Sequence, residues 1–437
     1  MDMKKRFLKT PIYDTLEDYL SKKPVRMHVP FHSSKPNNNV IPREVYNIDI
    51  SEVSGYDIEG EDNPIVQSEK ITADFFSCEH SFYLTGGASI GLLASMISLN
   101  KYGKKVILAR NVHKSVINGV ILSGLEPLWL EVDFINEWGV FSSINTKKLS
   151  ELIQLNKDIC GCVIVSPTYE GITSDIKEIS DLCHKNGIPL IVDEAHGAHL
   201  CFLNDKGLKS AVQLGADIVV QSWHKSLGSL TQSGVLHLVN SKFFTYSDLK
   251  RSLDLVSSTS PSFLLLLSLE LTRKSFVADE GVFFNQLLNN VLSLRALLEA
   301  KPEIKLLDSD DKLKIYLKMK NISGIELAFY LYKKYFIEIE SANEIGLLMY
   351  PGKNYNRNTE DVISRTFDTL LKDEAFNHLN YKEKKFLKPE INKIVLSPRR
   401  AFMEGFNKNR ASNYSSEIKA SCPPGYVLNI PGSKKCN

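Results

Sequence analysis

The stretch that decides the fold is Gln221-Ser-Trp-His-Lys-Ser-Leu-Gly228. It follows the apolar run Ala216-Asp-Ile-Val-Val220, whose β-branched residues predict a buried strand. A second run of this kind, Pro189-Leu-Ile-Val-Asp193, ends in a carboxylate. Because ligands in parallel sheets bind outside the carboxyl ends of the strands, we expect Lys225 and Asp193 to face the same site.

A lysine and an aspartate in these positions suit one kind of chemistry. The Lys225 amine can form a Schiff base with an aldehyde cofactor, and the Asp193 carboxylate can pair with a protonated ring nitrogen. Pyridoxal 5'-phosphate needs both groups. The alternatives are a solvated surface lysine and an aspartate that caps the next helix. The occurrence of both residues at strand ends favours the cofactor.

Strands alternate with helices from about residue 41 onward, which predicts an α/β fold with a mostly parallel sheet covered on both faces. Polar clusters follow three more predicted strands, at Gly86–Ser89, Arg110–Ser115 and Pro167–Tyr169. We expect these clusters to converge with those around Lys225 and Asp193. Thr168 and Tyr169 either line the pocket or form a structural turn.

The loop Gly86-Gly-Ala-Ser89 lies between a predicted strand and a helix, where backbone N–H groups can hold a phosphate. Gly87 and Ala88 would contribute backbone groups and Ser89 a hydroxyl. An ordinary tight turn is the alternative. Ser222 and His224 flank the lysine and could also reach the phosphate, or else be a buried hydroxyl and a supporting histidine.

Three histidines near the predicted strand ends are candidates for the same site. His113 could stack on the cofactor ring, and His196 could bind the ring's phenolic oxygen or a substrate carboxylate. His199 is expected to be structural, as a lone histidine often is. Only His196 and His199 of Asp193-Glu-Ala-His-Gly-Ala-His199 would share a helical face, and we predict no metal site.

Length and composition limit the possible functions. With 437 residues, the chain is long for one domain, and we predict an N-terminal arm (1–40), a cofactor-binding large domain (41–300) and a small C-terminal α/β domain with a tail (301–437). Lys and Arg number 53 against 51 Asp and Glu, so we expect neither nucleic acid nor membrane as a partner. Seven scattered cysteines and the lack of an apolar N-terminal segment favour a cytoplasmic protein.

Several motifs together resemble the Orn/Lys/Arg decarboxylases, and in particular their short bacterial forms without the N-terminal wing domain. The resemblance runs over nearly the whole chain. Its most specific motifs are Arg110-Asn-Val-His-Lys-Ser-Val-Ile-Asn-Gly119, Pro167-Thr-Tyr-Glu-Gly171, Asp193-Glu-Ala-His-Gly-Ala-His199, Ser222-Trp-His-Lys-Ser226, Ser258-Thr-Ser-Pro-Ser262 and the tail Cys422-Pro-Pro-Gly425 with Pro431-Gly432.

The resemblance implies the aspartate-aminotransferase-like architecture, fold type I of the pyridoxal phosphate enzymes. It implies that Lys225 is the Schiff-base lysine, that Asp193 is the partner of the ring nitrogen and that His113 stacks on the ring. Ser89, Ser222 and His224 match phosphate ligands. Thr259 and Ser260 match a segment that approaches the cofactor of the neighbouring subunit, which implies a homodimer or a larger homo-oligomer.

The chain departs from the family pattern in four places. The early motif His-Val-Pro-Gly-His-Lys reads His28-Val-Pro-Phe-His-Ser33, and Ala88 stands where a hydroxyl residue is usual. Gly55–Pro64 lacks the expected histidines, and Ser433 replaces a glutamate. Most of these changes concern the substrate and subunit-interface side.

The sequence therefore predicts a carboxy-lyase that converts a basic L-amino acid (arginine, lysine or ornithine) into CO₂ and an amine of polyamine biosynthesis. Lys225, Asp193 and His196 would be its catalytic residues, with His196 or Lys225 returning a proton to Cα. Arginine is slightly favoured, by the resemblance alone. The alternatives are another fold type I enzyme, such as an aminotransferase or an acyl-CoA condensing enzyme, or a non-catalytic protein that binds the cofactor.

Overall fold

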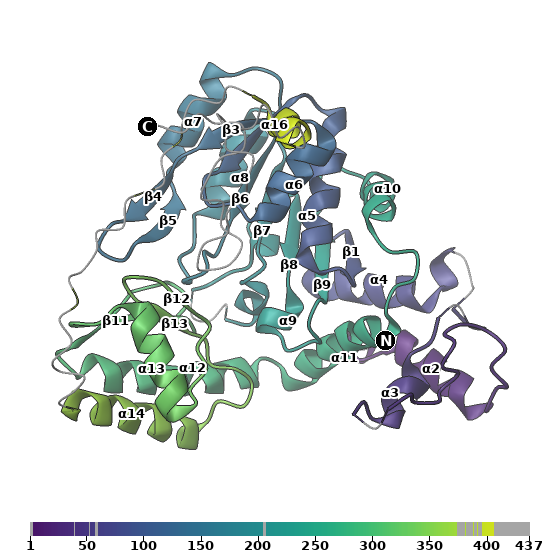
Figure 1. Cartoon of the computed structure of the whole chain (residues 1–437). Helices are drawn as coiled ribbons and strands as arrows, with labels where there is room; N and C mark the ends of the chain where they lie inside the picture. Colours follow the sequence, from purple (N-terminus) through teal and green to yellow (C-terminus); the bar gives the residue numbers. More distant parts are fainter. Residues whose placement is uncertain are drawn as a thin grey trace.

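The computed structural model describes residues 3–38, 40–51, 53–56, 60–203, 207–373, 381, 388, 391 and 396–405. Within these residues the largest element is a seven-stranded sheet at the centre of the molecule (Figure 1). Its strands, in spatial order, are β1 (His80–Leu84), β9 (Gly234–Leu238), β8 (Ile218–Gln221), β7 (Leu190–Asp193), β6 (Ile159–Val165), β2 (Lys105–Ala109) and β3 (Glu126–Leu130). Only β9 runs antiparallel to its neighbours, so the sheet is mostly parallel, as predicted.

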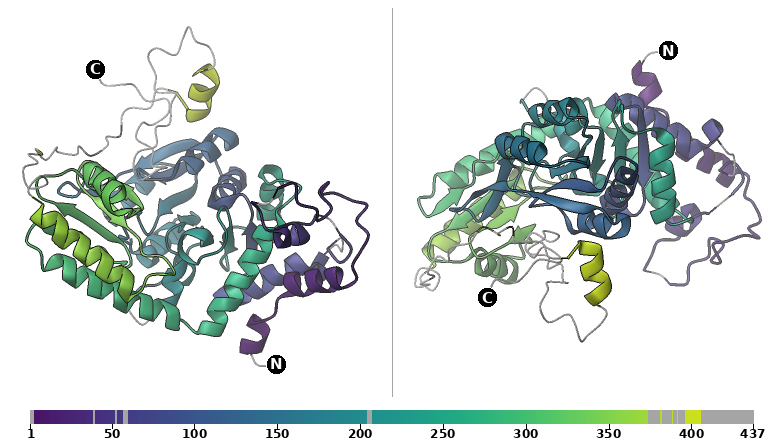
Figure 2. Two further views of the ribbon diagram at one scale, coloured as in Figure 1. Left: turned by 60° about the horizontal axis from the view of Figure 1, so that its bottom comes forward. Right: turned by 90° about the horizontal axis from the view of Figure 1, so that it is seen from above.

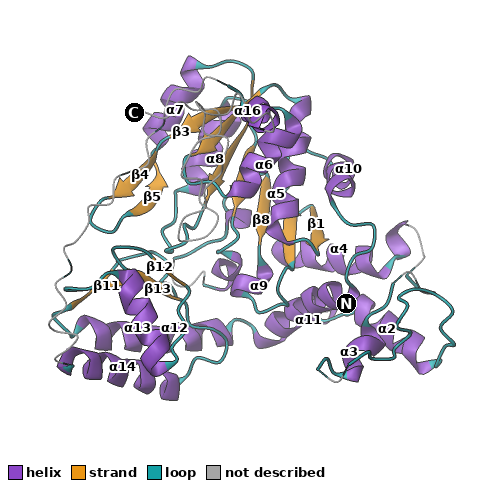
Figure 3. Ribbon diagram, viewed as in Figure 1, coloured by secondary structure: helices purple, strands orange, loops and turns teal. Residues whose placement is uncertain are grey.

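Helices cover both faces of this sheet, as the view from above shows (Figure 2, right), and Figure 3 distinguishes these helices from the strands by colour. The helices that accompany it are α4 (Pro64–Phe76), α5 (Gly87–Ser98), α6 (Lys114–Ser123), α7 (Thr146–Leu155), α8 (Ile176–Lys185), α9 (Trp223–Ser226) and α10 (Tyr246–Val256). The short 3-10 helices are η1 (Gly60–Asp62), η2 (Leu99–Lys101), η3 (Ala198–Phe202) and η5 (Ala211–Gln213).

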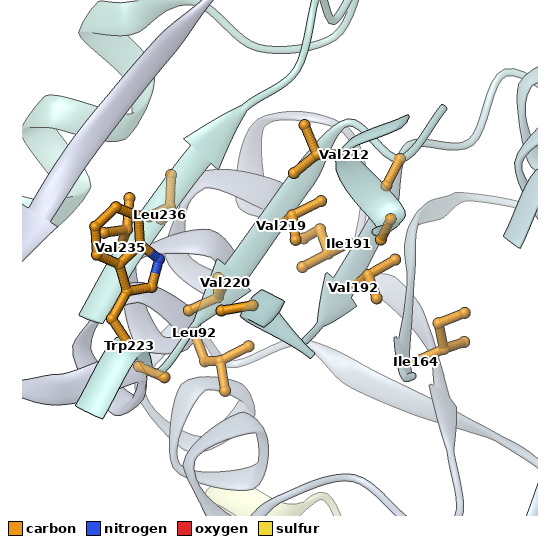
Figure 4. Close-up of a cluster of buried hydrophobic side chains, with 14 of the residues drawn as sticks. Leu92, Ile164, Ile191, Val192, Val212, Val219, Val220, Trp223, Val235 and Leu236 are labelled. Atoms are coloured by element: carbon orange, nitrogen blue, oxygen red, sulfur yellow. The ribbon is translucent and has the colours of Figure 1, made fainter. Parts of the chain in front are cut away.

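The core lies between the sheet and these helices. Ile191, Val192, Val219 and Val220 are fully buried, and Trp223 packs beside them (Figure 4). A sheet buried on both faces requires apolar residues at consecutive positions, which explains the continuous runs in the sequence. Polar side chains cluster where the parallel strands end, and a polar pair inside the sheet, Ser81 and His237, is hydrogen-bonded at 2.8 Å.

A second, four-stranded sheet lies apart from the first and has only antiparallel pairs. Its order is β10 (Ile304–Leu306), β11 (Ile315–Met319), β13 (Leu347–Met349) and β12 (Ser341–Ala342). The helices α12 (Val282–Glu299), α13 (Gly324–Tyr335) and α14 (Arg357–Lys372) accompany it, and α11 (Phe263–Asp279) leads to it from the large sheet (Figure 1). We call residues 301–373 the small domain; its exact boundary stays a prediction.

The N-terminal region docks on α11 through a buried acid. The helices here are α1 (Met3–Phe7), α2 (Pro11–Ser21) and α3 (Arg43–Ile48). Glu270 of α11 accepts the backbone N–H groups of Ile12 and Tyr13, at 3.0 and 2.8 Å, at the start of α2. Helix starts leave such N–H groups without partners, so this buried acid helps to fix the segment. Phe31 and Met27 in the following loop are almost fully exposed.

The structure differs locally from the predicted elements. The apolar pattern predicts a strand at 312–319, but the strand begins only at Ile315, because the Lys314 N–H donates to the Asp311 carbonyl in a turn. The sequence also predicts a helix at 113–123, but it begins at Lys114, because His113 is its N-cap. Sequence analysis missed the hairpin of β4 (Val132–Ile135) and β5 (Val140–Ile144). Helix α16 (Pro398–Gly405) precedes the tail, and the tail motifs fall outside the described residues.

Candidate active site

A cavity of about 420 Å³ opens where the large sheet's parallel strands end. Polar clusters after β1, β2, β6, β7 and β8 all reach it, as expected from the sequence. The predicted site residues that line it are Gly87, Ala88, Ser89, His113, Asp193, His196, Ser222, His224 and Lys225. Tyr169 also lines it, whereas Thr168 is buried in a turn, where its hydroxyl accepts the Ile172 N–H at 3.1 Å.

Lys225 lies in the single turn α9, and its side chain opens onto the cavity. Its Nζ is 3.0 Å from Nε2 of His196. The surrounding protein excludes much of the water, which lowers the pKa of Lys225, while the Asp193 and Glu340 charges oppose this effect. A lysine with a lowered pKa has more of its amine neutral near pH 7, and only the neutral amine is a nucleophile.

Asp193 is a buried carboxylate whose negative charge is only partly compensated by its surroundings. It is 3 % exposed, and its Oδ1 accepts the Ala195 N–H at 3.1 Å. Burial raises its pKa to about 6, although the Lys225 charge partly opposes the rise. A cationic ring nitrogen bound in the cavity would supply the missing positive charge. The site thus fits the pyridine nitrogen of the predicted cofactor.

His113 and His196 are both neutral at this site. Burial lowers the pKa of His113 to about 4, with smaller effects of Lys225 and Lys114, and its Nδ1 caps α6 by accepting the Ser115 N–H. Burial and the nearby lysines hold the pKa of His196 well below its usual range. The His196 ring meets the Tyr169 ring edge to face, with centroids 4.4 Å apart.

The start of α5, where the sequence predicts the phosphate site, forms one end of the cavity. Gly87 has φ +77, which favours glycine, and no side chain caps the helix at Gly86, so first-turn N–H groups can serve an anion. Ser222 is buried nearby. His224 differs from the expectation in one respect: its Nδ1 lies 2.7 Å from the Ser233 carbonyl oxygen and must donate to it. A phosphate contact through Nε2 would therefore require His224 to be protonated.

Thr259 and Ser260 are not brought to this cavity by their own chain. Both are exposed, in the loop between α10 and α11. The alternative interpretation of the segment before α11, an ordinary helix N-cap formed by a Ser or Thr hydroxyl, also lacks support, since the N-cap residue Ser262 makes no side-chain capping bond. His199 lies outside the cavity, fully buried, and its Nε2 is 3.0 Å from Asp311 Oδ2. Their assigned roles remain predictions.

Three residues near the site were missed. Asn111 lines the cavity with 1 % exposure, and neither of its amide atoms has a hydrogen-bond partner among the described residues. Lys314 and Glu340 come from the small domain, more than 85 residues after Lys225 in the chain. Asn111 belongs to a motif quoted above, whereas Lys314 is visible only as a lysine beside an apolar run, which does not indicate a place near Lys225. Nothing in the local pattern indicates Glu340.

Comparison with known proteins agrees with this geometry. The family described as Orn/Lys/Arg decarboxylase, major domain, matches residues 10–322. An arginine decarboxylase of Bacillus subtilis is 27 % identical over 445 residues, covering 97 % of this chain and 90 % of the relative. The biodegradative arginine decarboxylase of Escherichia coli is 26 % identical over 245 residues, covering 50 % of this chain and 32 % of the relative.

The solved structures show the same fold at lower identity. Lysine decarboxylase A from Pseudomonas aeruginosa superposes with a TM-score of 0.79 at 15 % identity, covering 98 % of this chain and 74 % of that one. No helix in the described part of this chain is both long and apolar enough to cross a membrane. The chain belongs to the Orn/Lys/Arg decarboxylase family, and it is a pyridoxal phosphate-dependent enzyme that decarboxylates a basic amino acid.

Proposed function

We propose that the preferred substrate is L-arginine. The observation that carries this proposal is that four relatives named arginine decarboxylase match 97 % of the chain, although the biodegradative arginine decarboxylase matches 50 % of it. Relatives named ornithine and lysine decarboxylase match 66 % and 52 % of it.

A carboxylate near the cavity supports a cationic substrate. Tyr169, which lines the cavity, donates its hydroxyl hydrogen to Glu340 Oε1, and the Glu340 charge acts on both Lys225 and Lys314. A guanidinium presents five N–H donors in a planar fork, which suits a carboxylate held in one place. We assign Glu340 to the cationic end of the substrate.

Each site residue has its own role in the proposed reaction. Pyridoxal phosphate, when bound, supplies the electron sink for loss of carbon dioxide. Lys225 carries the cofactor, Asp193 keeps its ring nitrogen protonated, and His113 supports the ring from one side. The start of α5 with Ser89 and Ser222 holds the phosphate. His224 joins them once the charge of the bound anion outweighs the burial that lowers the pKa of this histidine. His196 lies beside Lys225, and one of these two residues returns the proton to Cα.

The proposed assembly is a homodimer in which Thr259 and Ser260 of each subunit reach the other's cofactor. The exposure of Thr259 and Ser260 in the single chain supports this assembly. A second observation supports it: the apolar side chains of Val25, Met27, Phe31 and Val40 are exposed to water, and contact with a second subunit would bury them. We also propose that the enzyme acts in the cytoplasm in polyamine synthesis. The free state of the described cysteines (Cys78, Cys160, Cys162, Cys183 and Cys201) fits a reducing compartment.

Product analysis tests the substrate assignment. The purified enzyme with pyridoxal phosphate is given arginine, lysine or ornithine, and CO₂ and the amine are quantified. We expect the decarboxylated arginine to form with the highest kcat/KM, and the Lys225→Ala variant to form no amine. A higher kcat/KM for lysine or ornithine would overturn the choice of arginine, and a keto acid or thioester-derived product would indicate one of the other fold type I reactions.

The Glu340→Gln variant tests how the substrate is recognised. Loss of the carboxylate should raise KM for arginine about 10- to 100-fold, as expected when a charged hydrogen bond is lost, while kcat changes little. Glu338→Gln changes an exposed carboxylate two residues earlier and serves as the matched control. Equal KM values in both variants would remove Glu340 from the substrate site.

A further inference from the structure

Lys314 is a fully buried lysine of the small domain that reaches the active site behind His196. It ends the turn that starts at Asp311 and directly precedes β11. Its stem packs on Gly171, where an added Cβ would lie 2.9 Å from Lys314 Cγ, and Gly171 has φ +92. The loop after β6 and the small domain thus approach each other around this side chain. Burial of an ammonium group costs free energy of folding unless the charge interacts with a suitable partner.

The ammonium of Lys314 contacts an aromatic ring and an imidazole. Nζ lies 3.3 Å from the ring centroid of Tyr350 and 3.5 Å from His196 Nδ1, at the long end of the hydrogen-bond range. No carboxylate of the described residues forms an ion pair with it within 4.0 Å. The charged groups that act on it from farther away are Asp311 on its own turn, Glu340 before β12, Glu170 after β6 and Lys225 in α9.

His196 therefore lies between two lysines, with Lys225 Nζ 3.0 Å from Nε2 and Lys314 Nζ 3.5 Å from Nδ1. A neutral imidazole has one N–H donor and one acceptor nitrogen, and an ammonium can only donate. Both lysines cannot donate to His196 at the same time while it stays neutral. One of them must face an N–H, and that lysine must offer an uncharged nitrogen.

We propose that Lys314 is a positioning residue that competes with Lys225 for His196 and decides which ring nitrogen carries the proton. When Lys225 is uncharged, Lys314 donates to Nδ1 and His196 presents its Nε2–H to Lys225 and the cavity. When Lys225 is an ammonium and Lys314 is neutral, the hydrogen moves to Nδ1. A proton passed from Lys314 to Nδ1, while Nε2 gives its own to Lys225, swaps the charge between the lysines and leaves His196 neutral.

The ionisation of Lys314 agrees with this competition. Burial lowers its pKa to about 8, Asp311 and Glu340 oppose the shift, and the Lys225 charge adds to it. Removal of the Lys225 charge must therefore raise the pKa of Lys314, because the coupling between two charges is reciprocal. Lys314 is the protonated partner at neutral pH whenever Lys225 carries no charge.

The test reads the tautomer of His196 by ¹⁵N NMR of histidine-labelled full-length protein without cofactor. The chain has 10 histidines, and His196 is assigned by the signal lost in His196→Gln. We expect opposite tautomers in two single variants at pH 7: Nε2–H in Lys225→Met, where only Lys314 remains, and Nδ1–H in Lys314→Met, where only Lys225 remains. Lys314→Arg, which keeps a cationic donor, should behave as the unmodified protein.

The matched control is Lys318→Met, because Lys318 is on β11, which Lys314 directly precedes, and its Nζ lies 4.9 Å from the Trp138 ring centroid, outside the cavity. It should leave the His196 signals unchanged. The same tautomer in Lys225→Met and Lys314→Met would overturn the proposal. If Lys314→Met does not fold, a pH titration of Lys225→Met decides between the outcomes. The His196 Nδ1 signal must shift as Lys314 loses its proton at or above pH 8. A signal that stays constant up to pH 11 would refute the contact between Lys314 and His196.

The inference rests on the proposed function in one respect only, the role of His196 or Lys225 in returning a proton to Cα. The tautomers are read without cofactor or substrate, so a wrong choice of arginine would leave the NMR result untouched. Conversely, a failed NMR test would leave the product analysis valid.

Discussion

At the scale of single residues, Asp193 is the group whose chemistry depends most on its place in the fold. We predict that Asp193→Asn lowers kcat/KM about 30- to 1,000-fold, the range for loss of one electrostatic contact to a transition state. The pyridoxal phosphate affinity should also fall, because the ring nitrogen loses its anionic partner. Steady-state kinetics and cofactor titration measure both. Turnover within a few fold of the unmodified enzyme would show that Asp193 does not serve the ring nitrogen.

The same substitution has a second, opposite effect on the protein without cofactor. The pKa of Asp193 is raised from 3.8 to about 6, so the folded state disfavours its ionised form, and this penalty is present above pH 6 and disappears as pH falls toward 3.8. Asp193→Asn should therefore stabilise the cofactor-free protein, by up to about 3 kcal/mol at pH 8 and about half of that at pH 5. Urea unfolding at both pH values measures this, with exposed Asp181→Asn as the control. A gain that is equal at both pH values would contradict the raised pKa.

At the scale of elements, the start of α5 combines an unusual backbone with the proposed phosphate site. Gly87 has φ +77, so Gly87→Ala should cost about 1–2 kcal/mol of unfolding free energy. Relaxation of that strain would turn the first-turn N–H groups, and we expect a clear loss of pyridoxal phosphate affinity as well. Gly187→Ala is the matched control, because Gly187 has φ +70 and open space around it, after α8 and away from the cavity.

Thermal unfolding and cofactor titration of the two glycine variants separate the effects. Both should lose similar stability, and only Gly87→Ala should bind the cofactor more weakly. Equal cofactor affinity in the two variants would mean that the start of α5 does not hold the phosphate.

At the scale of the whole molecule, the proposed dimer predicts complementation between inactive subunits. Lys225→Ala subunits are mixed with subunits that carry Thr259→Ala and Ser260→Ala. If sites are shared, a hybrid dimer collects all lesions in one site and none in the other, and part of the activity returns. Activity assays after subunit exchange measure this. Mixtures no more active than their parents, or an active monomer in sedimentation, would exclude the shared site.

The sequence by itself determined the large sheet and most of the cavity. Continuous apolar runs such as Ile188–Val192 are typical of strands buried on both faces in mostly parallel sheets, in which the carboxyl ends of the parallel strands meet at one edge. Lys225, Asp193, His113, His196 and the Gly86–Ser89 loop could therefore be assigned from local pattern and resemblance. The start of β11 at Ile315 could not be assigned in this way, because Leu313 and Lys314 donate their N–H groups to Asp311 in a turn, and the strand begins only after it.

Only the tertiary structure decided what the small domain adds to the site. Lys314 and Glu340 lie in segments whose own periodicity says nothing about Lys225, and they reach it because the two sheets pack around Gly171 and Tyr169. The tautomer of His224 was equally hidden, since it depends on a carbonyl oxygen nine residues away in the chain. The position of each strand in the chain follows from short-range patterns of burial, whereas contacts between domains depend on long-range packing that no local pattern records.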